Sequence, residues 1–263
     1  MPVIAQKILA IAGDDTASVS MLESIIENDP AISAKILSVS NSAFYGFKTP
    51  ANTLGGAIVR IGFSNVKNIA LGISLMTVLH NGKTDTTLDY HRIFNHSVAT
   101  GFIASLLSRS LKLNVSEETL ICGMLHDIGF LVLSSHFNET YLKVMDVFKG
   151  EMTLLEAERE IFGFTHSDIG KWLAEKWSLP DTVTDVILNH HCPLQANENR
   201  LQVALVHTAD VIATRSILSV TRKNPQYPFE HKCLETLGIS DADIHQFEEQ
   251  IKSGELLSDL FTI

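Results

Sequence analysis

Nearly every patterned segment of this chain repeats its apolar residues with a helical period, and alternating β-branched runs closed by hairpin turns are scarce. A period of about 3.6 residues places apolar side chains on one face of a helix, whereas strand side chains alternate between two faces. With 263 residues and 45% hydrophobic content, the chain is long enough to bury a substantial core. The pattern therefore predicts an all-α fold.

Start and stop signals locate the expected helices. Ser20 followed by Glu23 predicts a capping box, and Thr153 followed by Glu156 predicts a second one. The sequence 28–30, Asn-Asp-Pro, predicts the end of one helix, and Gly62 closes another that begins at Leu54. Later helices are expected at about 90–111, 116–134, 139–148, 153–162, 166–177, 181–190 and 200–218.

A polar connector at 80–87 predicts a boundary inside what we interpret as a single folded unit. We expect an N-terminal helical lobe at 1–87, a helical bundle at 88–218 that carries a candidate metal site, and a C-terminal helical extension at 219–263.

Charge and cysteine content exclude several classes of protein. The net charge of -10 argues against general nucleic-acid binding, which needs a basic surface. Cys122, Cys192 and Cys233 form no CxxC pair, so neither a disulfide framework nor a thiolate zinc site is expected. No apolar run reaches the 18 residues of a membrane span, and residues 1–13 lack signal-peptide features. We therefore expect a cytoplasmic protein that does not enter a membrane.

An ionisable pair, His126-Asp127, interrupts the apolar segment 120–133. A buried carboxylate needs a cation, a hydrogen-bond network or a metal ion. His96 and Asp210 are the candidate partners, and Asp210 shares a helix face with apolar residues at 203, 206 and 213. Two carboxylates and two imidazoles from separate helices are typical of a divalent metal site, and the absence of sulfur favours iron, manganese, nickel or zinc.

Three more histidines extend this set, namely His166, His190 and His191. With them a second metal ion is conceivable, and a two-metal site would suit hydrolysis of a phosphoester. The alternatives stay open: His126 and Asp127 can form a buried hydrogen-bonded pair without metal, and His166 can simply begin its helix. Adjacent helical residues diverge by about 100°, so one of His190 and His191 is expected to point away from the site.

The order His96, His126-Asp127, Asp210 resembles the H…HD…D signature of the HD superfamily of metal-dependent phosphohydrolases. Over roughly 19–215 the chain resembles the HDOD branch of that superfamily, which occurs in bacterial signalling proteins. The resemblance lies in the segments 37–43 (LSVSNSA), 57–62 (AIVRIG), 95–99 (NHSVA), 123–129 (GMLHDIG), 177–180 (WSLP) and 190–193 (HHCP). It implies a two-lobed helical fold and a role in signal transduction.

Two departures bear on the activity that this resemblance implies. Related HD-GYP phosphodiesterases carry a Lys where this chain has Phe130, and a GYP segment where it has Cys192-Pro193-Leu194. We therefore expect a regulatory protein with a retained metal site, which contacts a signalling protein or a small phosphorylated ligand. The alternative is a phosphohydrolase for a nucleotide or other small phosphoester, with Asp127 as the predicted catalytic residue and Lys171 or Arg92 as the phosphate contact.

Overall fold

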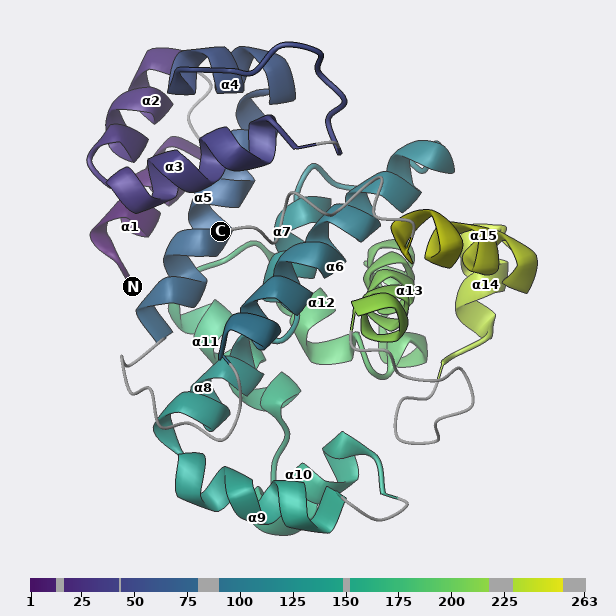
Figure 1. Cartoon of the computed structure of the whole chain (residues 1–263). Coiled ribbons are helices and arrows are strands. Elements are labelled where there is room, and N and C mark those ends of the chain that lie inside the picture. The colour runs from purple at the N-terminus through teal and green to yellow at the C-terminus, as the bar shows by residue number, and fades with distance from the viewer. Residues whose placement is uncertain (13–16, 43, 80–89, 149–151, 218–228, 253–263) are drawn as a thin grey trace. The chain divides into compact units, whose positions relative to one another are not determined.

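Every regular element in the described part of the chain is a helix (Figure 1). The computed structural model describes residues 1–12, 17–42, 44–79, 90–148, 152–217 and 229–252. The prediction of an all-α fold is confirmed. The helices are α1 (Val3–Ala12), α2 (Val19–Glu27), α3 (Pro30–Ser40), α4 (Leu54–Ile61), α5 (Phe63–Leu79), α6 (Tyr90–Ser110), α7 (Thr119–Leu125), α8 (Ile128–His136), α9 (Asn138–Phe148), α10 (Leu154–Phe162), α11 (His166–Lys176), α12 (Asp181–Asn189), the short 3₁₀ helix η1 (Pro193–Gln195), α13 (Arg200–Ile217), α14 (Lys232–Leu237) and α15 (Asp241–Lys252).

The two predicted capping boxes have different outcomes. The box of Thr153 with Glu156 is present at the start of α10. The box of Ser20 with Glu23 is wrong, because the side chain of Ser18 caps α2 by accepting from Met21 N at 3.2 Å. Glu23 instead accepts a hydrogen bond from Gly55 N at 2.8 Å, so its carboxylate caps the distant helix α4.

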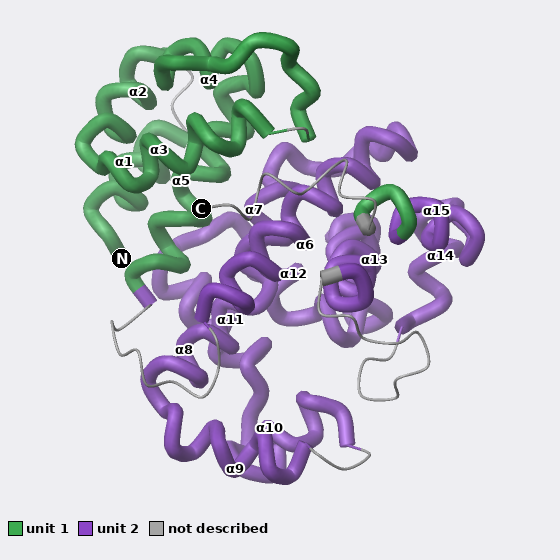
Figure 2. The backbone as a smooth tube through the Cα atoms, viewed as in Figure 1, with its two compact units in different colours: residues 1–78, 249–263 green, residues 79–248 purple. Residues whose placement is uncertain are grey.

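The described residues divide into two compact units (Figure 2). Unit 1 consists of Met1–Val78 with the described residues from Glu249 onward, and unit 2 consists of Leu79–Glu248. The connector expected at 80–87 lies outside the described residues, so the lobe boundaries drawn from the sequence stay predictions.

Unit 1 packs α2 against α1, α3 and α4. Its fully buried side chains come from successive turns of these helices, as the helical period predicts, and include Ile8, Leu22, Ile26, Ile36 and Ile58. Asp29 caps α3 by accepting from the amides of residues 31 and 32, and Thr53 caps α4 through Gly56 N. Helix α1 has no counterpart among the expected helices.

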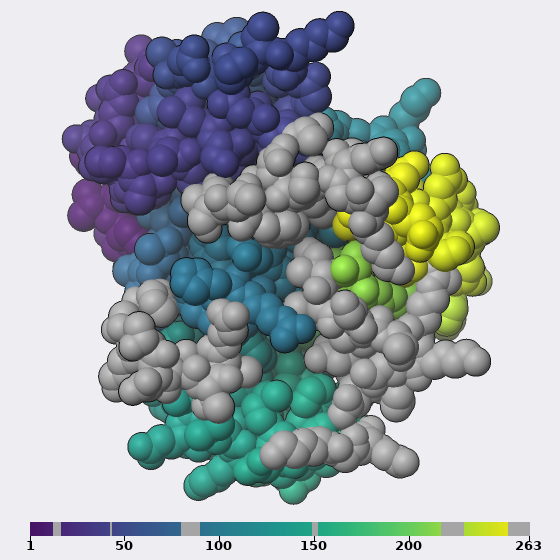
Figure 3. All heavy atoms as spheres, viewed as in Figure 1, coloured from purple at the N-terminus to yellow at the C-terminus, as the bar shows by residue number. Residues whose placement is uncertain are grey.

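Unit 2 is built around α6, which contacts both α7 and α13. Helices α8, α11 and α12 continue the bundle, with α11 in contact with both of the others. Helices α9 and α10 pair with each other over an apolar cluster that includes Leu133, Tyr141 and Val144. Part of α14 and α15 is visible at the molecular surface (Figure 3), whereas Cys233 and Ile244 in these helices are buried.

One described segment, Thr119–His136, is long and apolar enough to cross a membrane, with a mean hydropathy of 1.3 over 18 residues. The bent pair α4 and α5, which meet at 116°, would be a second candidate if counted as one span. Of the window Thr119–His136, 78% is buried inside the protein, which is the usual position of a core helix.

Candidate metal centre

Unit 2 brings together all seven residues predicted as metal ligands. His96 lies on α6, His126 and Asp127 form the turn between α7 and α8, and His166 is the first residue of α11. His190 and His191 follow α12, and Asp210 lies on α13. The cluster therefore lies where six helices begin, end or pass, namely α6, α7, α8, α11, α12 and α13.

The single helix expected at 116–134 is wrong, because the chain turns at His126-Asp127 between two helices. Asp127 has φ -100° and ψ 20°, which takes it out of the helical conformation. The turn directs α8 against α11, and a Cβ atom on Gly129 would overlap the carbonyl oxygen of His166. Only a glycine permits this approach, which places His166 beside the turn.

A second close approach joins α6 to α7. A Cβ atom on Gly123 would lie 2.5 Å from the Cα atom of Gly101, closer than real Cβ contacts. The two backbones can therefore touch only because both residues are glycines. This contact brings His96 near His126, with ring centroids 5.4 Å apart.

The first group of candidate ligands gathers around the Oδ2 atom of Asp127 and the Oδ1 atom of Asp210. His96 Nε2 lies 3.0 Å from Asp210 Oδ1 and 3.9 Å from Asp127 Oδ2. His126 Nε2 lies 3.2 Å from Asp127 Oδ2 and 3.6 Å from Asp210 Oδ1. Two imidazole nitrogens and two carboxylate oxygens thus face one another.

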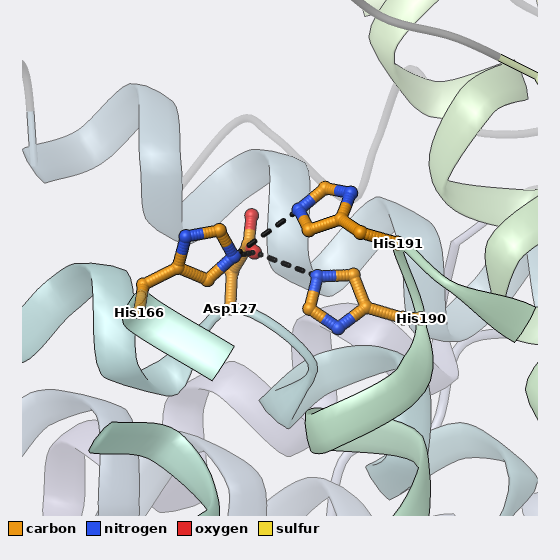
Figure 4. A group of neighbouring side chains, drawn as sticks. All are labelled: Asp127, His166, His190 and His191. Carbon is orange, nitrogen blue, oxygen red and sulfur yellow. Dashed lines mark hydrogen bonds and ion pairs between the residues drawn. The ribbon is translucent and has the colours of Figure 1, made fainter. Parts of the chain in front are cut away.

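The second group gathers around the other oxygen of the same carboxylate (Figure 4). Asp127 Oδ1 lies 3.4 Å from His166 Nε2 and 3.3 Å from His190 Nε2. His191 Nε2 lies 3.1 Å from His166 Nε2, so His191 belongs to the group as well. Both His190 and His191 face the site, contrary to the expectation that one of them points away, because the chain leaves α12 at Asn189.

Hydrogen bonds at Nδ1 fix the orientation of the His126 and His190 rings. His126 Nδ1 lies 2.7 Å from Gly123 O, and His190 Nδ1 lies 2.9 Å from Ile187 O. A carbonyl oxygen can only accept, so both Nδ1 atoms carry the hydrogen. In the neutral rings the Nε2 atoms then present lone pairs, and these point at Asp127.

Three atoms at the centre of the cluster are buried and lack a hydrogen-bond partner in the described part of the chain: His126 Nε2, His190 Nε2 and Asp127 Oδ1. Lone pairs on nitrogen and on a carboxylate oxygen repel each other at 3.2–3.3 Å unless a positive charge lies between them. That charge is either a proton on the imidazole or a cation. Nitrogen and carboxylate donors converging in this way suit a divalent transition metal.

Without a metal, the cluster shares its charge unevenly. Burial acts to lower the pKa of His126, but the negative charges of Asp127 and Asp210 outweigh it and raise that pKa well above the ordinary value. Burial acts to raise the pKa of Asp127, but the positive charge of His126 holds it well below its usual range. The pKa of Asp210 is likewise held well below its usual range, because contacts with His126 and His96 outweigh burial.

The second group contains one histidine whose pKa is raised and one whose pKa is lowered. Burial acts to lower the pKa of His166, but the charge of Glu158 outweighs it and raises that pKa. The pKa of His191 is well below its ordinary value, because burial and the charges of His190 and His166 all disfavour its protonation. A neutral imidazole is the form that binds a metal ion, and the lowered pKa of His191 favours that form.

Glu158 contacts one of the candidate ligands, a position that was not predicted from the sequence. Its carboxylate is completely buried and accepts hydrogen bonds from His166 N, His166 Nδ1 and Tyr141 Oη, each at 2.8 Å to its nearer oxygen. A carboxylate on Nδ1 holds the ring with its Nε2 lone pair toward Asp127. The signal was present in the sequence: Glu158 shares the apolar face of α10 with Leu154 and Ile161.

His207 also supports the site, although the sequence suggested an ordinary histidine. Its Nδ1 donates to the carbonyl oxygen of His190 at 2.7 Å, and its Nε2 accepts from Glu230 N at 3.0 Å. The buried ring of His207 thus holds the backbone at His190 in place. Only the fold reveals this role, since Glu230 is distant in sequence.

Neither predicted phosphate contact is among the residues of the cluster. Lys171 Nζ pairs with Glu175 at 3.7 Å on an outer face of α11, and Arg92 is exposed near the start of α6. Phe130, which occupies the position of the HD-GYP lysine, packs its ring 6.1 Å from that of His166 and 5.2 Å from that of Tyr141. It therefore forms an apolar wall behind His166.

A pocket of about 260 Å³ opens beside the cluster, and His191 and Asp210 are among its lining residues. Neither Lys171 nor Arg92 lines it, but Arg159 on α10 does.

Solved structures confirm the fold. An HDOD domain protein with unknown function from Geobacter sulfurreducens matches with a TM-score of 0.80 and 22% identity, over 100% of this chain and 93% of that chain. A candidate phosphohydrolase from Shewanella amazonensis SB2B matches with a TM-score of 0.77 and 19% identity, over 99% and 93%. A candidate signal transduction protein from Marinobacter aquaeolei VT8 matches with a TM-score of 0.74 and 23% identity, over 100% and 59%.

Sequence comparison gives the family. An uncharacterized protein of Treponema pallidum (strain Nichols) is 26% identical over 205 residues, which are 73% of this chain and 37% of that protein. The chain thus spans little more than a third of the length of this relative. The model of the HDOD domain matches residues 1–193, a span that holds every candidate ligand except Asp210. The chain therefore belongs to the HDOD domain family.

Proposed function

We propose that this chain is a cytoplasmic regulatory protein of signal transduction whose unit 2 holds one or two divalent transition-metal ions. The observation that carries the proposal is the convergence of histidine Nε2 atoms on the two oxygens of Asp127, with three of the rings oriented by hydrogen bonds at Nδ1. A structural hydrogen-bonded cluster would give these buried atoms partners, yet three of them have none in the described part of the chain.

The ligands fall into two sets that share Asp127. The first consists of His96, His126, Asp127 and Asp210, and the second of Asp127, His166, His190 and His191. Nitrogen and oxygen donors suit iron, manganese, nickel or zinc. A bound ion would act as a Lewis acid and would lower the pKa of a coordinated water.

A regulatory role is favoured by Phe130. A lysine at this position would offer a charge to a phosphate, but the phenyl ring offers none and packs against Tyr141 and His166. The partner would be a signalling protein or a small phosphorylated ligand that binds differently to the metal-loaded and the metal-free form of unit 2.

The second candidate is a metal-dependent phosphohydrolase that acts on a nucleotide or other small phosphoester. It is favoured by the pocket, because His191 and Asp210 line it and so connect both ligand sets to a space that a small molecule can enter. In that case His96, His126, Asp127 and Asp210 hold the ion, and Asp127 is the residue on which activity depends most.

Metal content and affinity test the proposal. Wild-type protein, Asp127→Ala and Asp127→Asn would be loaded with Fe²⁺, Mn²⁺, Ni²⁺ or Zn²⁺, and bound metal would be measured by elemental analysis and calorimetry. His136→Ala is the matched control, since His136 is exposed at the end of α8, outside the cluster. We expect metal in the wild type and in His136→Ala and a large loss in both Asp127 variants, with circular dichroism showing which variants are folded.

Wild-type protein that binds these ions no better than a folded Asp127→Asn would contradict the metal site. The loaded proteins would then be assayed on a panel of phosphomonoesters and phosphodiesters. Turnover that the Asp127 variants lose and His136→Ala keeps would replace the regulatory proposal with the hydrolase. No turnover by the fully loaded wild type would reject the hydrolase.

A further inference from the structure

The pocket beside the candidate metal centre is lined by apolar side chains, by charged side chains and by two members of the ligand cluster. It lies between α10, the chain that follows α12, and α13. His191 and Asp210 line it on the side of the ligand cluster, and both belong to the less buried part of that cluster, whereas His126, His166 and His190 are fully buried. A molecule in the pocket therefore meets the cluster at its accessible side.

Apolar side chains form much of the remaining wall. Leu154 and Leu155 come from the first turn of α10, and Val211 follows Asp210 on α13. Such a surface suits the carbon skeleton or the ring of an organic molecule, because apolar contact area is removed from water on binding. An inorganic anion alone would leave it uncovered.

Two arginines, Arg159 and Arg215, line the pocket together with the carboxylates of Glu156 and Asp210. The two arginines differ in what they already bind. Arg215 pairs with Glu248 at 3.3 Å, and its guanidinium lies 5.7 Å from the centre of the Phe229 ring. Its charge is thus offset by a buried carboxylate.

The guanidinium of Arg159 is exposed and forms neither an ion pair nor a hydrogen bond with any described residue. Its charged neighbour Glu156 already accepts from Thr153 N at 2.7 Å and from Thr153 Oγ1 at 2.9 Å. No hydrogen bond therefore joins the guanidinium of Arg159 to the described residues, although its charge acts on the Glu156 carboxylate. A guanidinium fork matches the geometry of a phosphate group.

The size of the pocket restricts the ligand further. Its volume of about 260 Å³ is just below the range of roughly 300–1,000 Å³ that sites for drug-sized ligands occupy. A molecule the size of one nucleotide suits this volume better than a cyclic dinucleotide, which is about twice as large.

We propose that this pocket binds a phosphoester no larger than a mononucleotide, with its phosphate on Arg159 and its organic group against Leu154, Leu155 and Val211. The inference rests on the proposed function in one respect, since it names the small phosphorylated ligand and where it binds. It also replaces Lys171 and Arg92 with Arg159 as the phosphate contact.

Calorimetric titration of the 263-residue protein tests the proposal. The probes are the four common nucleoside 5′-monophosphates, ribose 5-phosphate, adenosine, inorganic phosphate and a cyclic dinucleotide. We expect one of the phosphomonoesters to bind more tightly than adenosine, inorganic phosphate and the cyclic dinucleotide. Arg159→Ala should weaken that binding about tenfold or more, because it removes a charge-assisted contact. Lys171→Ala removes an exposed cation outside the pocket and should leave the affinity unchanged.

A second variant makes the test independent of charge. Leu155→Trp narrows the pocket from its apolar side, so we expect it to weaken phosphomonoester binding without changing the affinity for inorganic phosphate. The proposal is overturned if no phosphomonoester distinguishes the wild type from a folded Arg159→Ala, or if the cyclic dinucleotide binds most tightly.

Each titration would be run after chelation and again with Mn²⁺, which separates this inference from the metal proposal. Binding that depends on Arg159 in a protein that takes up no metal supports the pocket and contradicts the metal centre. Metal uptake without any binding that depends on Arg159 contradicts the pocket alone.

Discussion

Glu158 shows what a single buried carboxylate does for the candidate site. It is completely buried, and its three hydrogen bonds join α9, through Tyr141, to the first residue of α11, His166. A buried carboxylate without such partners would be strongly unfavourable. The same hydrogen bonds that stabilise the buried carboxylate of Glu158 also determine which nitrogen of His166 faces Asp127.

Replacing Glu158 should separate its positioning role from simple packing. We expect Glu158→Ala to lower the free energy of unfolding by about 3–5 kcal/mol, because it leaves buried partners unpaired. Metal affinity should fall by about 10–100-fold, the usual effect of losing a carboxylate that orients a ligand histidine. Glu158→Gln keeps an acceptor for His166 Nδ1 and should recover most of both losses. Calorimetry and chemical denaturation measure the two quantities.

Glu160→Ala is the control for this comparison, since Glu160 is exposed on the same helix. A Glu158→Gln variant that binds metal no better than Glu158→Ala would argue against an orienting role.

At the scale of elements, two glycine contacts set the distances within the site. Gly123 meets Gly101 where α7 crosses α6, and Gly129 meets His166 and Gly170 where α8 crosses α11. The first crossing brings His96 to His126, and the second brings His166 to Asp127. Helix packing and ligand geometry therefore depend on the same atoms.

Gly123→Ala should disturb the first crossing. The new methyl group would lie 2.5 Å from a backbone atom of Gly101, which cannot rotate away as a side chain can. We expect a loss of about 1–3 kcal/mol in the free energy of unfolding, as for other overpacked cores, together with weaker metal binding.

Gly56→Ala is the matched control, because there the nearest atoms belong to the side chains of Thr53 and Ala51. Thermal melts and metal titrations of the two variants provide the comparison. Equal melting temperatures for the two variants would show that a methyl group at position 123 does not strain the contact between α6 and α7.

Local signals in the sequence predicted most helices but not their junctions. The bounds of α4 and the capping box of α10 were predicted correctly, since neighbouring residues determine both. The helix expected at 116–134 was wrong, because its apolar period continues through His126-Asp127 although the chain turns there and α8 then packs closely against α11. Glu23 was misassigned for a similar reason, since it caps a helix 32 residues away.

At the scale of the whole molecule, the candidate ligands lie entirely within unit 2, and unit 1 contributes none of them. The sequence predicted all seven residues of the cluster, because ionisable groups are conspicuous in apolar helices. It did not predict Glu158, His207 or the pocket, since these depend on contacts between helices that are separated in the chain.

Metal binding should therefore stabilise the two units differently. An ion that binds only the native state stabilises it by RT ln(1 + [L]/Kd), about 2.7 kcal/mol at a concentration 100 times Kd. We expect metal addition to slow hydrogen exchange in α6, α7, α11, α12 and α13, with little change in α1–α4. Hydrogen exchange followed by mass spectrometry, with and without a chelator, measures this pattern. Equal protection of α1–α4 would show that the effect of the metal is not confined to unit 2.

Asp127 gives one oxygen to each group of ligands, and this has a consequence for the order of loading. The first group has a second carboxylate in Asp210, but the second group has only histidines besides its share of Asp127. A cation bound at one oxygen of Asp127 would reduce the negative charge that attracts a second cation to the other oxygen. If both groups bind metal, we therefore expect the two positions to fill in sequence and with unequal affinity, so that a protein exposed to scarce metal would hold a single ion.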